Sequence, residues 1–97
     1  MVQIELAPEV ADDIDRIFDH LTEHEVDDVP LRINEINQAI SVLELNPLIG
    51  RPTYGDKREL IIGRRARGYV ALYRYIIEID TVLVLALKGQ KEAGYSG

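Results

Sequence analysis

Cysteine is absent from this chain of 97 residues, tryptophan is also absent, and long hydrophobic runs are missing. Without cysteine the chain forms neither disulfides nor thiolate metal sites, so its apolar residues, 46% of the total, must hold one modest core unaided. No uncharged apolar run reaches the length of about eighteen residues that a membrane-spanning helix needs. The start MVQIELAPEV lacks the sections of a signal peptide. We therefore expect a cytoplasmic protein with a single domain over residues 1–97 and no membrane partner.

Basic residues are scarce in the first half of the chain. Residues 1–50 hold twelve Asp or Glu and only two Arg, a formal charge of −10, whereas residues 51–97 hold nine Lys or Arg and five acids, a formal charge of +4. The overall charge of −6 therefore conceals two oppositely charged parts. Such an asymmetry favours two surfaces with different partners.

The first half has the pattern of one strand followed by two helices. Apolar and polar residues alternate over residues 2–6, as in a half-buried strand. Residues 8–24 carry an apolar stripe at helical spacing, with proline in the first turn. Asp28 can cap a second helix whose apolar seam runs over residues 29–43, and the short connection predicts that the two helices are antiparallel neighbours.

After residue 50 the periodicity becomes that of strands. Runs of β-branched or aromatic residues cover 58–62, 69–77 and 82–87, which predicts an antiparallel meander. The last run lacks polar alternation, so we expect it to be a central strand covered on both faces or nearly so. In the middle run, the odd-numbered residues should face the core, and Arg74 on the other face needs a charge partner or solvent. The predicted fold class is α+β, in the order β-α-α-β-β-β, with a helical hairpin packed on a small, mainly antiparallel sheet.

The stretch from His20 to His24, HLTEH, matches the H-x-x-E-H pattern of inverted zinc peptidases. On a helix, both imidazoles could reach one zinc ion. A catalytic site also needs a third ligand, but the chain has no other histidine, and His20 falls about 100° from the apolar stripe at 3.6 residues per turn. We interpret the match as coincidental and expect no metal site and no cofactor.

Five segments follow one another in a characteristic order. They are IELAPEVADDIDRIFDHL (4–21), LNPLIGRP (45–52), KRELIIG (57–63), GYVALYRY (68–75) and VLVLALKGQK (82–91). Each is common alone, but together they resemble the RelE/ParE superfamily of bacterial toxins from toxin–antitoxin modules, also described as plasmid stabilization proteins. The resemblance covers nearly the whole chain and implies the same β-α-α-β-β-β fold.

The resemblance implies one of two activities. RelE-like members cleave mRNA in the ribosomal A site with Lys, Arg and Tyr side chains, whereas ParE-like members lack the full set and poison DNA gyrase. In the RelE register this chain has Arg58 followed by Leu60 and Ile62 where paired lysines are expected, and it has Val70 where an essential Arg is expected. Gln90 and Lys91 replace a basic pair, and Tyr95 follows at a shorter spacing. These differences favour the ParE branch.

The resemblance also suggests which residues contact a target. If the chain is an RNase, the expected catalytic residues are Arg58, Arg65, Lys91 and Tyr95. The expected target-binding residues are Arg51, Arg58, Arg64, Arg65, Arg67, Arg74, Lys88 and Lys91. The run from Arg64 to Arg67 is equally consistent with a solvated turn.

Three functional hypotheses follow. The first is a gyrase inhibitor that binds without catalysis, the second is a ribosome-dependent mRNA endonuclease, and the third is an inactive orphan of the same fold. The charge of −6 counts against ribosomal entry. The resemblance further implies a cognate antitoxin whose C-terminal segment wraps the toxin, and the acidic helical hairpin suggests that this segment carries Lys or Arg.

Overall fold

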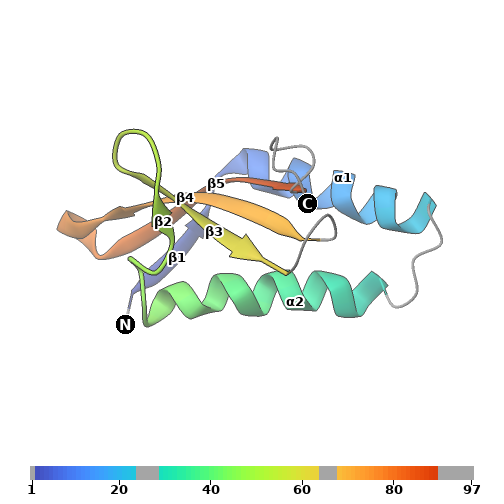
Figure 1. Cartoon of the computed structure of the whole chain (residues 1–97), viewed down its shortest axis with the longest axis horizontal. Coiled ribbons are helices and arrows are strands. Elements are labelled where there is room, and N and C mark those ends of the chain that lie inside the picture. The colour runs from blue at the N-terminus through green and yellow to red at the C-terminus, as the bar shows by residue number, and fades with distance from the viewer. Residues whose placement is uncertain (1, 24–28, 64–67, 90–97) are drawn as a thin grey trace.

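Five strands and two main helices form the fold in this computed structural model, which describes residues 2–23, 29–63 and 68–89 (Figure 1). In chain order the elements are β1 (Gln3–Leu6), α1 (Pro8–Glu23), α2 (Val29–Ser41), the 3-10 helix η1 (Val42–Glu44), β2 (Arg51–Pro52), β3 (Lys57–Ile62), β4 (Tyr69–Ile76), the 3-10 helix η3 (Ile77–Ile79) and β5 (Thr81–Gly89). The predicted order is confirmed, and β2, η1 and η3 are additions to it.

One mixed sheet joins all five strands in the order β1-β5-β4-β3-β2. Strands β3, β4 and β5 form the predicted antiparallel meander, and β1 pairs with β5 in parallel, from Gln3 opposite Thr81 to Leu6 opposite Val84. A parallel pair needs a long crossover, which α1, α2 and the meander supply. The first and last elements of the described residues therefore lie side by side.

The core lies between the two helices and one face of the sheet. The helices run antiparallel (Figure 1), and their apolar stripes enter the same cluster of buried side chains. Burying a Leu, Ile or Val side chain stabilises a fold by about 1.5 to 3 kcal/mol. The cluster comprises Val10, Ile17 and Leu21 from α1, Ile36 and Ile40 from α2, Leu43 from η1, and Ile62, Ala71, Tyr73, Val82, Val84 and Leu87 from the sheet.

The predicted central strand, β5, lies inside the sheet between β1 and β4, and none of its residues from Val82 to Leu87 is exposed. A register shift opposite Leu72 and Tyr73 lets Val82, Val84 and Leu87 all face the helices. One detail of the predicted sheet was wrong. Strand β4 ends at Ile76, so Ile77 does not continue the buried row but lies in η3 with its side chain largely exposed. The chain then turns at Asp80 in the left-handed conformation, with φ of 48°.

Candidate functional site

The sheet face turned away from α1 and α2, called here the outer face, combines charged residues with an apolar centre. Side chains alternate along a strand, and Leu60 and Ile62 of β3 pack toward the helices, so their neighbours in sequence point outward. The cross-strand pairs then show which residues of β2, β4 and β5 lie on the same face as these outward-pointing residues. The outer face comprises Arg51, Lys57, Glu59, Ile61, Val70, Leu72, Arg74, Leu83 and Ala86.

Cations on the outer face already have partners within the chain. Arg51 Nε lies 3.2 Å from Glu59 Oε1, and Arg74 Nη2 lies 2.8 Å from Asp56 Oδ2. Both pairs are partly exposed, so each stabilises the fold by at most about 1 kcal/mol. The predicted need of Arg74 for a charge partner is confirmed. A phosphate group would have to compete with these carboxylates, which makes the face less suited to nucleic acid than its cations suggest.

Arg58 points the other way and holds the segment that follows η1. Its Nη1 donates hydrogen bonds to the carbonyl oxygens of Leu48, at 3.1 Å, and Gly50, at 2.8 Å. A guanidinium fixed by two carbonyls is well suited to positioning a loop. Sequence reasoning placed Arg58 in a catalytic or target-binding set, and its role toward a target stays a prediction.

Tyr73 holds the same segment from the core side. The Gly50 N–H donates a buried hydrogen bond of 2.8 Å to the Tyr73 hydroxyl, and a Cβ on Gly50 would lie only 2.6 Å from that oxygen. Glycine is therefore required at this position by close approach. Burial raises the pKa of Tyr73 above its ordinary value, against the opposing effects of the Gly50 N–H and the Arg58 charge, so the hydroxyl stays protonated.

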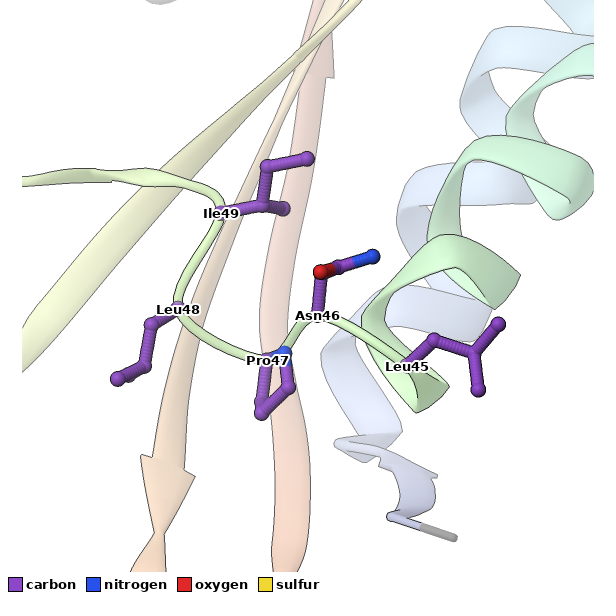
Figure 2. Close-up of a pocket in the computed structure, with 5 residues that line it drawn as sticks. All are labelled: Leu45, Asn46, Pro47, Leu48 and Ile49. Carbon is purple, nitrogen blue, oxygen red and sulfur yellow. The ribbon is translucent and has the colours of Figure 1, made fainter.

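In the segment held in this way, the apolar loop (residues 45–49), the side chains extend in several directions from the backbone (Figure 2). Leu45 is 75% exposed, and Leu48 and Ile49 are each 55% exposed. Together with Asn46 and Pro47 they line a shallow hollow of about 390 Å³. The sequence signal was the run LNPLI, which entered the sequence analysis only as part of the family resemblance. A loop without charge that is fixed from behind and exposed in front has the form of a contact surface.

A cluster of polar side chains, mostly from α1, closes the open edge of β5. β1 pairs with β5 only as far as Val84, and beyond it side chains of α1 replace the missing strand. The Leu87 N–H donates to Asp13 Oδ2 at 2.9 Å, and Arg16 Nη2 donates to the Leu87 carbonyl at 3.3 Å. Arg16 Nη1 and Lys88 Nζ approach Asp13 Oδ1 at 2.9 and 3.2 Å.

The charge of Asp13 is stabilised by these contacts. Burial alone would raise the pKa of Asp13, but the Leu87 N–H, Arg16 and Lys88 outweigh it and hold the pKa below the ordinary value of 3.8. The carboxylate therefore stays ionised at neutral pH. Its position closes a strand edge that would otherwise offer unpaired backbone groups to another chain.

The zinc motif finds no support in the described residues. His20 is exposed on α1, as predicted, and His24 lies outside the described residues. In the described ranges no group of three or more His, Cys, Asp or Glu side chains could hold a metal ion. The match therefore stays without a structural counterpart.

Comparison with known proteins identifies the family of this chain. The sequence profile described as "ParE toxin of type II toxin-antitoxin system, parDE" matches residues 4–94. This chain belongs to the ParE toxin family. The RelE/ParE resemblance seen in the sequence is thereby confirmed, with the ParE branch favoured. No curated protein sequence matches the chain.

Solved structures share the fold of this ParE-family chain. A chain of the chromosomal ParDE toxin–antitoxin system from P. aeruginosa superposes with a TM-score of 0.74 at 20% identity, covering 92% of this chain and 96% of that one. A chain of the intact E. coli RelBE toxin–antitoxin complex gives a TM-score of 0.61 at 16% identity, with the same coverage. At these identities the likeness establishes the fold, two helices on a five-stranded mixed sheet.

The residues predicted to contact a target are only partly placed in the ParE-family fold. Four of them are described, and each has a partner within the chain: Arg51 and Arg74 pair with acids near the outer face, Arg58 binds the apolar loop, and Lys88 binds Asp13. Arg64, Arg65, Arg67, Lys91 and Tyr95 lie outside the described residues. Within the described ranges no helix is long and apolar enough to cross a membrane.

Proposed function

We propose that this ParE-family toxin inhibits DNA gyrase by binding it, without catalysing a reaction, and that a cognate antitoxin neutralises it. Both gyrase and the alternative target, the ribosome, are cytoplasmic in bacteria, which is where we place the protein. Family membership supports the toxin role. The choice of gyrase over mRNA rests on the described residues, which lack the cations that RNA cleavage needs.

The observation that carries this choice is the apolar character of the positions where the RelE resemblance expects cations. Leu60 and Ile62 pack into the core against the helices, while Val70 is buried on the opposite side of the sheet. Phosphoryl-transfer chemistry needs cations and a proton donor or acceptor gathered around one phosphate. Apolar side chains divided between two faces of a sheet cannot supply that arrangement.

The described cations on the outer face do not replace the catalytic side chains that the RelE resemblance expects. Lys57 lies 5.0 Å from the centre of the Tyr54 ring, a cation–π contact, and Arg74 is paired with Asp56. Tyr73, which could act as an acid, is fully buried on the helix side. These placements support a toxin that acts through binding.

The antitoxin should be basic where it crosses α1. The outward side of this helix carries five exposed acids and no exposed lysine or arginine: Glu9, Asp12, Asp15, Asp19 and Glu23. An antitoxin segment with Lys or Arg at matching spacing would be attracted by this charge and fixed in register. An acidic segment lying over α1 would contradict this part of the proposal.

Expression of the chain in a sensitive bacterium tests the proposal. We expect filamentation and induction of the DNA-damage response, because a poisoned gyrase leaves broken DNA, and we expect coexpression of the adjacent antitoxin gene to restore growth. Cleavage of mRNA at codon boundaries without DNA damage would support the RelE-like alternative. A normal growth rate at high expression would support the inactive orphan.

A further inference from the structure

We propose that the apolar loop is the anchor point for the antitoxin, and that it takes an antitoxin segment with aliphatic or aromatic side chains flanked by Lys or Arg. The inference rests on the proposed function, since it assumes that an antitoxin binds this chain. It goes beyond that function by naming a surface and the chemistry of the segment that covers it.

The loop is held rigidly before any partner arrives. Its backbone is fixed by the Arg58 bonds to Leu48 and Gly50, by the Tyr73 bond to Gly50, and by a turn in which the Ile49 N–H donates to Asn46 O at 3.1 Å. A surface that is ordered in advance loses little conformational entropy on binding. The loop therefore has the preorganisation expected of an interaction site.

A second exposed apolar segment lies near the loop. The Val2 N–H donates to Glu44 O, directly before the loop, and the Gln3 N–H donates to Asp80 O, directly after η3. Because successive residues of a strand bond in opposite directions, η1 and η3 flank the start of β1 on its two sides, about 10 Å apart. Ile77 and Ile79 of η3 are each more than half exposed. The apolar loop thus lies at an end of the molecule with further exposed aliphatic side chains.

The charges around this end are acidic. Glu44 precedes the loop and Glu78 lies between the two exposed isoleucines, and neither is paired with a cation within the described residues. Asp80 accepts a hydrogen bond from the Tyr75 hydroxyl. The arginines nearest in sequence to these acids are paired elsewhere, Arg51 with Glu59 and Arg74 with Asp56.

This charge pattern selects among the possible occupants. A second copy in an isologous dimer would bring the same acids against each other, and like charges across an interface oppose association. The phosphates of a nucleic acid would be repelled by the acids and would make no favourable contact with the aliphatic side chains. A basic, partly apolar protein segment satisfies both features, and it matches the sign of charge expected for the antitoxin over α1.

The test uses the purified toxin with the product of the open reading frame next to its gene, together with overlapping peptides that tile the C-terminal half of that product. Binding is measured by calorimetry for the wild type and for Leu45→Gln/Leu48→Gln. Leu31→Gln is the matched control, because Leu31 is a similarly exposed leucine near the other end of α2. We expect the double variant to bind about tenfold more weakly or worse, as for a central contact of an interface, and the control to bind like the wild type.

Charge reversal tests the second half of the proposal. Glu44→Lys/Glu78→Lys should weaken binding and flatten its dependence on sodium chloride, whereas Glu35→Lys, on the exposed part of α2, should have a smaller effect. The strongest binding peptide should contain Lys or Arg beside aliphatic or aromatic residues.

Three results would overturn the inference. Unchanged antitoxin affinity in the double leucine variant would remove the loop from the interface. Loss of toxicity with antitoxin binding intact would assign the loop to the target. A concentration-dependent dimer abolished by the leucine substitutions would make it a self-association surface. Failure of the proposed function is distinguishable, because it appears in the wild type alone: mRNA cleavage without DNA damage, normal growth on expression, or no binding of the antitoxin would reject that function without any leucine variant.

Discussion

Replacing Asp13 by alanine removes the group that closes the open edge of β5. The Asp13 side chain is 8% exposed, and its carboxylate accepts hydrogen bonds from the Leu87 N–H, Arg16 and Lys88. Alanine leaves the Leu87 N–H without its partner, and a buried unpaired donor costs about 1 to 3 kcal/mol. The contacts with Arg16 and Lys88 add less, about 0.5 kcal/mol each, because both cations are partly exposed.

The expected loss for Asp13→Ala is therefore about 2 to 4 kcal/mol of the free energy of unfolding. For a domain of this size each kcal/mol lowers the melting temperature by about 4 to 8 °C, so the melting temperature should fall by at least 8 °C. The assay is urea unfolding followed by circular dichroism, with thermal unfolding as a check. Such a loss is a large fraction of the stability of a small domain.

Asp12→Ala is the matched control, because Asp12 is the neighbouring aspartate on the same helix and is exposed. It removes the same charge without removing a buried contact, so its effect should stay within about 0.5 kcal/mol. Equal stability losses for Asp12→Ala and Asp13→Ala would refute the reasoning. In that case the strand edge would not depend on the carboxylate.

Three further predictions concern stability. Gly50→Ala should destabilise the fold by about 1 to 3 kcal/mol, because the new Cβ would lie 2.6 Å from the Tyr73 hydroxyl and 2.9 Å from Glu59 O; urea unfolding measures it, and an unchanged midpoint would contradict the close packing. Tyr73→Phe should cost a similar amount by leaving the Gly50 N–H unpaired, whereas Tyr54→Phe, at an exposed tyrosine, should cost under about 0.5 kcal/mol in the same assay. Because the pKa of Asp13 in the folded state lies below 3.8, the stability that its charge contributes is complete above pH 3.8 and is lost as the pH falls through the folded-state pKa. The difference in free energy of unfolding between the wild type and Asp13→Asn, measured at a series of pH values, should therefore become smaller below pH 3.8. A difference that stays constant with pH would exclude the ionised carboxylate as its cause.

The elements that sequence reasoning recovered are those with a strong local pattern. The apolar stripe along residues 8–24 and the seam over 29–43 correspond to α1, α2 and η1, because helical spacing alone determines which side is buried. The three β-branched runs correspond to β3, β4 and β5, with Tyr73 buried as expected. The parallel pairing of β1 with β5 was not predicted, since it joins segments far apart in the sequence.

The site residues were harder to predict because their roles depend on contacts between distant elements. Asp13 is one of the twelve acids in the first half of the sequence, and nothing in the pattern sets it apart, yet it reaches Leu87 across the fold. Arg58 read as a surface cation, yet its partners are the carbonyls of Leu48 and Gly50. In both cases the residue type indicated charge, and only the fold showed which backbone groups that charge satisfies.

A gyrase assay with purified components tests the central claim most directly. The wild-type chain is added to gyrase, ATP and plasmid DNA, and the fractions of supercoiled and cleaved plasmid are measured with and without the antitoxin. The account predicts loss of supercoiling and accumulation of cleaved plasmid, both reversed by the antitoxin, and no cleavage of mRNA on translating ribosomes. Unimpaired gyrase together with mRNA cleavage by the same preparation would contradict it.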